Sequence, residues 1–445
     1  MGWCLPSMAS CLSQGRDSSR PNAHQAAFSH RMDQAPRMFH VNHVRPLVVA
    51  ALAAVSLCGA SDASAQSWPT QPVTFFDGRL LFAGDASATY GSADPGWFTY
   101  ADYETHTLRR VRAGLTIEAR PSRRLVFLAE LRAQSGSGIR PYAWYVRFNP
   151  LASGVVSIQA GRIPPVFGTY ARRSYPQDNP LIGDPLMYQY LTTVRADAMP
   201  GSADDLARMR ARGWLVQYPV GNPAPYSGLP IVAASRWDTG IQARFGTQTL
   251  EGAVALTVGT LSNPLVKEDN ETRQLAGHLA WRPMPALAVG VSAAHGGFLG
   301  RDVLAARPDV RDTSSHQQAF GVDAEASWGR WLIRGEFVAN QWTVPPIDAP
   351  VITQPLAARA GYIEARFRVR PRFYVAARGD RIWFSSILTS SGGMTWDADV
   401  SRLELGVGYT IRRGLLVKSS VLSHWRDGGL IRRSTLAGVQ LLFWL

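Results

Sequence analysis

The sequence predicts a membrane-spanning antiparallel β-barrel of about sixteen strands. Three observations support this fold class. Apolar and polar residues alternate in segments of about ten residues from Leu108 to Leu445. The connections between segments are alternately short and long, and charged residues occur in the middle of the segments. A strand points successive side chains to opposite faces, so alternation produces one apolar and one polar face. An apolar exterior around a charged interior is typical of a barrel with a water-filled lumen.

The residues before the barrel are predicted to be a leader. Residues 1–37 are polar and indicate an unstructured extension or a misassigned start, because Met38 lies at a normal distance before a signal peptide. Residues 38–65 have the pattern of that peptide: an apolar core over Leu47–Leu57 precedes the small-residue cleavage site Ala63-Ser64-Ala65. The core is too short for a membrane helix. We expect residues 66–79 to form a periplasmic segment and residues 80–445 to form the barrel.

Composition excludes several classes of function. All three cysteines (Cys4, Cys11 and Cys58) lie in the leader, so the mature chain has no thiol that could mispair in an oxidising compartment or bind a metal. The net charge is +13, but the arginines are spread singly along alternating segments, which argues against a nucleic-acid partner. No histidine lies in a His-Glu-x-x-His motif, and no Gly-x-Ser-x-Gly motif occurs. We therefore predict no enzyme, no cofactor and no metal site.

The alternating segments can be placed one by one along the chain. They begin near Leu80, Thr107, Leu125, Tyr142, Val155, Trp237, Thr249, Gln274, Leu287, Gln318, Trp331, Ala358, Phe373, Ser401, Leu415 and Ser434. Breaks such as Pro121–Arg124 and Gly329-Arg330 are short, whereas Gly91–His106 and Gly259–Arg273 are long. Short turns at one rim and long loops at the other match a bacterial barrel with both termini on the periplasmic side. Prolines at the turns and aromatic residues near strand ends agree with this arrangement.

One connection, residues 162–230, is much longer than the others. A loop of this length in a compact fold is usually functional. Ser202, acidic Asp204 and Asp205, three following arginines and Gly213 predict a capped helix over Ala203–Arg212. Such a helix either lies in the lumen or forms solvated ion pairs on the surface.

The order of the loops and one short motif resemble a known family. Strand count and loop order are similar to those of general sixteen-stranded porins. Gly161-Arg162-Ile163-Pro164-Pro165-Val166-Phe167-Gly168 resembles the corresponding strand end of phosphate-selective O/P-type porins, although the chain lacks the coiled coil and lysine-rich lumen of that family. The resemblance implies that this third loop folds into the lumen and sets the narrowest cross-section. It also implies a homotrimer.

Charged residues of the loop and the strands are the candidate site residues. The predicted pore constriction consists of arginines in the long loop: Arg162, Arg172, Arg173, Arg195, Arg208 and Arg212. The predicted lumen wall consists of charged residues at inward positions: Arg110, Arg112, Arg132, Arg147, Arg236, Arg244, Glu118, Glu130 and Asp238. The same alternation points Arg378, Arg402, Glu364, Asp380 and Glu404 inward. Mixed charges predict at most a weak preference for anions, and purely structural ion pairs are the alternative.

The sequence thus predicts a channel in a bacterial outer membrane for passive diffusion of small hydrophilic solutes. Outer-membrane lipid and these solutes are the expected partners. The last segment, Leu436–Leu445, alternates and ends in aromatic residues, which resembles the signal read by the barrel-assembly machinery. A non-conducting barrel, an adhesin or structural protein plugged by its long loop, is the alternative function. A soluble secreted β protein is the alternative fold, but its second face would expose too much apolar surface.

Overall fold

The computed structural model describes residues 71–100, 106–135, 138–169, 175–233, 237–269, 272–308 and 315–445. The predicted extension (1–37) and signal peptide (38–65) lie outside the described residues, as does the start of the predicted segment 66–79. The first described strand, β1 (Val73–Phe75), pairs with β2 (Leu80–Gly91) in the register Val73↔Phe82.

The long strands form one closed antiparallel barrel. They belong to a 17-stranded sheet in which β1 is a short addition to β2, and the other sixteen strands close on themselves because the last strand pairs with β2 in the register Asp85↔Trp444. The predicted sixteen-stranded barrel is confirmed. Its strands after β2 are β3 (Val111–Ala119), β4 (Leu125–Gln134), β5 (Gly138–Phe148), β6 (Val156–Ile163), β9 (Asp238–Gly246), β10 (Leu250–Thr257), β11 (Gln274–Met284), β12 (Leu287–Gly297), β13 (His316–Trp328), β14 (Trp331–Trp342), β15 (Leu356–Arg370), β16 (Phe373–Phe384), β19 (Val400–Arg412), β20 (Leu415–Arg426) and β21 (Arg433–Trp444).

Most strands begin close to the predicted residue, and two differ more. The second barrel strand begins at Val111 instead of Thr107, because the Thr107 hydroxyl is buried and accepts a 2.7 Å hydrogen bond from Gln189 of the long loop. The fourth begins at Gly138 instead of Tyr142, because Gly138 already pairs with Gln134 of β4. In both cases the strand boundary depends on a pairing or a tertiary contact that alternation does not reveal.

The two faces of the barrel wall differ as the alternation predicts. Large apolar side chains point outward, for example Leu275 (56% exposed), Phe320 (66%) and Ile363 (69%), while alternate positions such as Ala276 and Ala319 are buried. Trp281, Trp328 and Tyr409 are exposed at strand ends. No helix in the described part of the chain is long and apolar enough to cross a bilayer.

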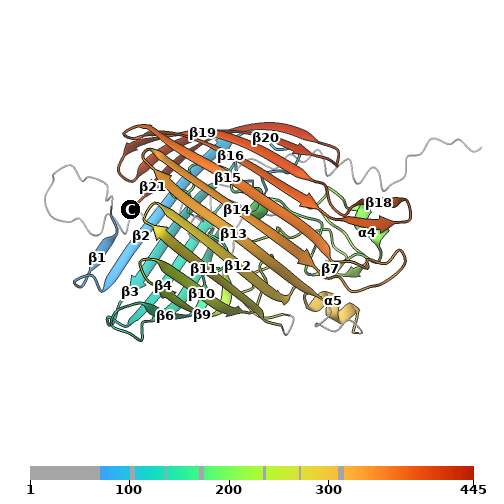
Figure 1. Ribbon diagram of the computed structural model, residues 1–445, viewed down its shortest axis with the longest axis horizontal. Helices are drawn as coiled ribbons and strands as arrows, with labels where there is room; N and C mark the ends of the chain where they lie inside the picture. The colour runs from blue at the N-terminus through green and yellow to red at the C-terminus, as the bar shows by residue number, and fades with distance from the viewer. Residues whose placement is uncertain are drawn as a thin grey trace, which may run out of the picture. The chain divides into compact units, whose positions relative to one another are not determined.

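Four of the shorter elements lie at one rim of the barrel (Figure 1). These are α4, α5, β7 and β18, whereas β1 and the C-terminus lie at the opposite rim. We call the first the long-loop rim and the second the short-turn rim. The shorter elements are α3 (Leu186–Gln189), β7 (Ala198–Met199), α4 (Ala203–Arg208), β8 (Val220–Gly221), α5 (Arg301–Ala306), β17 (Ser386–Thr389) and β18 (Gly392–Thr395).

The predicted helix in the long loop is shorter than expected. α4 has its predicted N-cap, because the Ser202 hydroxyl accepts from Asp205 N, but it ends at Arg208 and not at Arg212. The chain turns at Ala211, whose φ of 63° is a left-handed conformation that no α-helix contains. Arg212 therefore lies beyond the helix, and the prediction Ala203–Arg212 is wrong in its second half.

Candidate functional site

Residues 176–189 of the long loop, here called the inner half, contact polar side chains of the barrel wall. The loop leaves the barrel at β6, yet its partners lie on β14, β16, β19 and β20, on the opposite side of the closed strand order. Those side chains belong to the wall face opposite the exposed apolar residues. The contacts join residues about two hundred positions apart along the sequence, for example Gly183 and Glu404.

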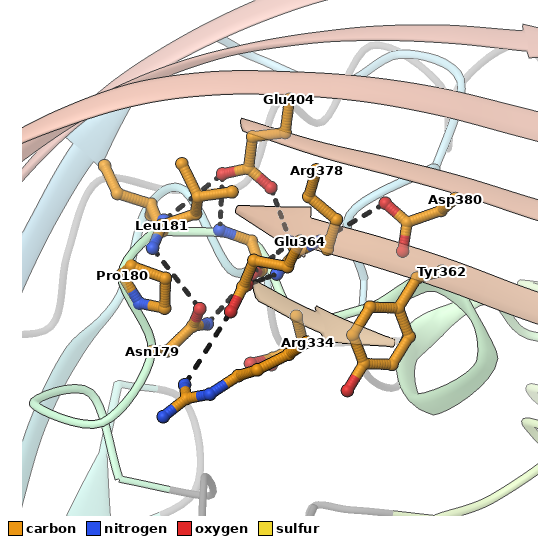
Figure 2. A network of polar contacts seen from close by, with 12 residues as sticks. Asn179, Pro180, Leu181, Arg334, Tyr362, Glu364, Arg378, Asp380 and Glu404 are labelled. Carbon is orange, nitrogen blue, oxygen red and sulfur yellow. Dashed lines mark hydrogen bonds and ion pairs between the residues drawn. The ribbon is translucent and has the colours of Figure 1, made fainter. Parts of the chain in front are cut away.

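Arg378 of β16 is the centre of these contacts (Figure 2). Its guanidinium is fully buried and lies 2.6 Å from a Glu404 oxygen, 3.1 Å from Glu364 and 3.3 Å from Asp380, and it also donates to the carbonyl oxygen of Gly183. Glu404 completes the contact by accepting from the Gly183 amide at 2.9 Å. One arginine among three carboxylates leaves negative charge, which backbone N–H groups of the loop help to satisfy.

Two more cations bind carbonyl oxygens of the inner half. Lys418 of β20 is 1% exposed, and its Nζ donates to Pro176 O and Asn179 O at 2.8 Å and to Leu181 O at 3.2 Å. Arg402 of β19 donates to Asp184 O and, at 3.2 Å, to Gln189 Oε1. Buried carbonyl groups need such donors. We call the wall residues that hold the inner half the anchor network: Arg378, Arg402, Lys418, Glu364, Asp380 and Glu404.

Glycine is required where the loop approaches the wall most closely. A Cβ atom on Gly183 would lie 2.7 Å from Glu404 Oε2 and 3.0 Å from Leu422 Cδ2. Tyr188 holds the end of the inner half, because its hydroxyl donates to Glu336 Oε2 at 2.6 Å. The inner half is therefore fixed by short polar contacts along most of its length.

The predicted lumen-wall residues lie mostly where the alternation places them. Buried Arg112 lies 3.6 Å from Asp85, Arg132 pairs with buried Glu130, and Arg147 lies 3.6 Å from Glu118. Direct strand pairs share a face, and the register Ser87↔Arg112, Thr116↔Glu130 and Ser157↔Arg244 puts these side chains on the polar side.

Three further wall predictions have different outcomes. Half-buried Arg110 precedes β3, and Arg236 lies outside the described residues. Asp238 is buried at the start of β9, where its carboxylate accepts from the amides of Gly259 and Leu265. Asp238 therefore shapes the end of a loop.

The structure does not bring the predicted constriction arginines together. Arg162 lies in β6 and donates to the carbonyl oxygens of Trp237 and Pro141, and Arg195 is 2% exposed and binds Asp197, Val216 O and Ala224 O within the loop. Arg208 is exposed and pairs with Asp205 at 2.9 Å, and Arg212 is exposed beyond α4. Arg172 and Arg173 lie outside the described residues.

Residues 191–233, the outer half of the long loop, pack against other connections of the long-loop rim. A buried apolar cluster joins Leu206 and Val216 to Phe298 and Trp396, and Trp214 stacks on Trp97 with ring centroids 4.5 Å apart. Apolar packing therefore holds part of the outer half.

Asp397 and Arg210 make polar contacts between the outer half and neighbouring loops; Arg210 donates to Thr395 and Asp427. Asp397 lies between β18 and β19, is fully buried, and accepts from the amides of Thr193 at 3.0 Å and Ala211 at 2.9 Å. Burial raises the pKa of this carboxyl to about 6, against the opposing effect of its backbone donors. The carboxyl ties two turns of the outer half to the neighbouring loop.

Three adjoining cavities follow the β9–β11 side of the barrel. A cavity of about 540 Å³ lies between the outer half and two other long connections, and a second of about 290 Å³ is lined by Arg244, Glu251 and His278 of the strands. A small cavity of about 30 Å³ shares Ala233 and Pro264 with the first and Val166 with the second. We call this narrow part the apolar link after Val166, Ala233, Leu261 and Pro264; Asp238, Thr257, Thr260 and Gln274 also line it.

Three comparisons place the fold among known structures. No family model matches the sequence, and no curated protein sequence matches it. Among solved structures, OmpF of Salmonella typhi, determined in complex with daunomycin, superposes with a TM-score of 0.53 at 10% identity, covering 84% of this chain and 100% of that one. The chain has the porin fold. The outer membrane channel DcaP of Acinetobacter baumannii gives a TM-score of 0.50 at 10% identity, with the same coverage of both chains.

The sequence did not reveal which wall residues contact the long loop. Glu364, Arg378, Asp380, Arg402 and Glu404 are correctly predicted to face inward, but their contacts with the inner half are not. Lys418 had a usable signal: it is one of two lysines after the leader in an arginine-rich chain, at an inward position of a strand. Nothing in the pattern identifies Asp397.

Proposed function

We propose that this chain is an outer-membrane channel for the passive diffusion of small hydrophilic solutes. The observation that carries the proposal is a closed barrel with an exposed apolar outer face and a charged inner face. An apolar belt of this kind is stable in a bilayer, and all backbone groups of a closed barrel are paired there. The proposal assigns no catalytic step, cofactor or metal to the chain.

The long loop crosses the lumen in this proposal. It leaves the wall at β6 and is hydrogen-bonded to β16, β19 and β20 on the other side, as the anchor network describes. A segment that joins opposite walls of a barrel divides its cross-section. The remaining path runs on the β9–β11 side, where the three cavities adjoin.

Selectivity in this path depends on the small size of the link and on charges of both signs. Asp238, Thr257 and Gln274 line the apolar link beside its apolar residues. In the adjoining cavity Arg244 and Glu251 have opposite charges. We therefore propose at most a weak preference for anions. Transport of solutes larger than the link would require side-chain movement.

Conductance of the purified protein in a planar lipid bilayer tests the proposal. We expect discrete channels, and we expect Val166→Ala/Leu261→Ala to increase the single-channel conductance, because both side chains narrow the apolar link. A matched variant, Ile363→Ala, removes an outward side chain and should leave conductance unchanged. Absence of channels from both the wild type and the widened variant contradicts the proposal.

Two observations favour a plugged, non-conducting barrel as the second candidate. The link measures only about 30 Å³, and the outer half packs against other long connections through a buried apolar cluster. This candidate requires that the wild type show no channels while the folded protein is present in the bilayer. An adhesin or a structural wall protein would behave in this way.

Localisation and assembly are proposed with the same function. We expect the mature chain in the outer membrane, in contact with lipid, after insertion by the barrel-assembly machinery, and we expect a homotrimer. Detergent-dependent extraction and heat-modifiable migration on a denaturing gel support the membrane location. Recovery from the soluble periplasmic fraction contradicts it.

A further inference from the structure

Exposed arginines gather on one part of the short-turn rim. Three successive hairpins of the closed strand order, β13–β14, β15–β16 and β19–β20, end there. Their turns carry five exposed arginines, which we call the basic arc: Arg330, Arg370, Arg372, Arg412 and Arg413. Beyond β21, the β1–β2 turn carries Arg79, and the β3–β4 turn carries Arg120, Arg123 and Arg124, of which Arg120 pairs with Glu118.

The rest of the short-turn rim has no such charge. The turns 149–155, 247–249 and 285–286 contain no charged residue, and Asp77 is the only acidic side chain of the described short turns. No arginine of the arc forms an ion pair with a described carboxylate. An arginine-rich composition explains the choice of arginine over lysine but does not explain why arginines gather on consecutive hairpins.

Apolar and aromatic side chains adjoin the basic arc on the outer face of the barrel. Trp331 (44% exposed), Val369 (38%), Tyr409 (45%) and Ile411 (42%) lie beside its arginines in sequence or across a strand pair. The Arg370 guanidinium lies 5.8 Å from the ring centroid of Phe373, which pairs with Tyr409. Exposed tryptophan and tyrosine mark the level where acyl chains meet headgroups. The Arg370 guanidinium therefore lies beside the outer face, at the level where headgroups are expected.

We propose that the basic arc binds the phosphate groups of anionic phospholipids in the periplasmic leaflet. Arginine presents a planar set of donors that matches a phosphate, and basic side chains near an anionic membrane surface each strengthen binding. Neighbouring hairpin turns are about 10 Å apart, since each spans two strand spacings, so long side chains from two turns reach one headgroup. The proposal rests on the membrane location of the barrel and not on conduction.

Lipid retention by the full mature protein, measured by native mass spectrometry, tests this proposal. The protein is titrated with phosphatidylglycerol and, separately, with phosphatidylcholine. We expect the wild type to retain phosphatidylglycerol preferentially, and Arg370→Gln/Arg412→Gln to bind it about 30-fold more weakly. The matched control Arg432→Gln/Arg433→Gln removes two exposed arginines from the long-loop rim and should leave this affinity unchanged.

Further measurements test the lipid site independently of the folding of the arc variant. If the arc variant does not fold, raising the salt concentration on the wild type should weaken phosphatidylglycerol binding and spare phosphatidylcholine binding. Equal retention of both lipids by the wild type, or equal loss in the control variant, overturns the proposal. It is also overturned if inorganic phosphate displaces the lipid at equal concentration, or if the arc variant loses binding to peptidoglycan sacculi while its phosphatidylglycerol binding is unchanged.

Conductance measurements on the same variants separate this proposal from the proposed function. A protein that forms no channels but retains phosphatidylglycerol through the arc supports the lipid site and contradicts the channel. A protein that forms channels but does not prefer phosphatidylglycerol supports the channel and contradicts the lipid site.

Discussion

The inner and outer halves of the long loop are held by different kinds of contact. The inner half, residues 176–189, is fixed to the barrel wall by buried charges, with Arg378, Arg402 and Lys418 donating to its carbonyl oxygens. The outer half, residues 191–233, is fixed by an apolar cluster, by the buried carboxyl of Asp397 and by Arg210, which binds Thr395 and Asp427. Leu186 and Met187 of the inner half belong to the same cluster. Removing one member of a buried ion network leaves the other members without a partner, whereas truncating a buried apolar side chain costs stability according to the cavity that it leaves. The difference predicts which half tolerates substitution.

Removal of Arg378 should have the largest effect on the loop. Arg378→Met leaves Glu364, Asp380 and Glu404 buried without their common cation, so we expect the free energy of unfolding to fall by about 3–5 kcal/mol. Urea unfolding in detergent, followed by tryptophan fluorescence, measures this loss. Arg381→Met, on the same strand but exposed, is the control and should cost less than about 0.5 kcal/mol. Equal stability of the two variants would mean that the network does not hold the loop.

Removal of Lys418 should have the next largest effect and should act locally. Lys418→Met leaves three loop carbonyl groups without their donor, and we expect a loss of about 2 kcal/mol, together with faster cleavage of the inner half by an added protease. Lys267→Met, at an exposed position of another loop, is the matched control. If both lysine variants resist cleavage as the wild type does, other contacts hold the inner half.

Much of the fold, but less of the site, was predictable from the sequence. Alternation reports which face of a strand a residue occupies, so it predicted sixteen strands and the inward direction of Arg378 and Glu404. Alternation does not reveal which residues a side chain contacts. Glu404, for example, contacts Gly183, which is distant in the sequence. The end of α4 was missed because the left-handed turn at Ala211 occurs at a residue type that rarely adopts it.

The outer half should respond to pH through Asp397. Burial raises its folded-state pKa to about 6, above its ordinary value of 3.8. The protonated carboxyl is therefore favoured in the folded state, and its contribution to stability is complete below pH 3.8 and lost as the pH rises through about 6. We expect amide hydrogen exchange of the outer half, corrected for intrinsic exchange rates, to be less protected at pH 7.5 than at pH 5. Asp397→Asn should remove this difference, and persistence of the difference in that variant contradicts the assignment.

The exposed arginines near α4 should have the smallest effect. Arg208 is paired with Asp205, and α4 packs near Pro350 and β17 at the long-loop rim, away from the apolar link. Charges at an exposed surface are screened within about 8 Å at physiological salt. We therefore expect Arg208→Glu/Arg212→Glu to leave the reversal potential in a salt gradient nearly unchanged. A clear shift of the reversal potential toward cation selectivity would show that these arginines lie at the constriction.

The most direct test of a path between the anchored loop and the β9–β11 wall is thiol modification during single-channel recording. Residues 66–445 contain no cysteine, so one introduced thiol is the sole target. Ala233→Cys and Val166→Cys place it in the apolar link, and Ser390→Cys places it on the exposed β17–β18 hairpin as a control. We predict that a charged methanethiosulfonate reagent reduces the current of both link variants and leaves the control unchanged. An unchanged current in both fully labelled link variants would contradict the proposed path.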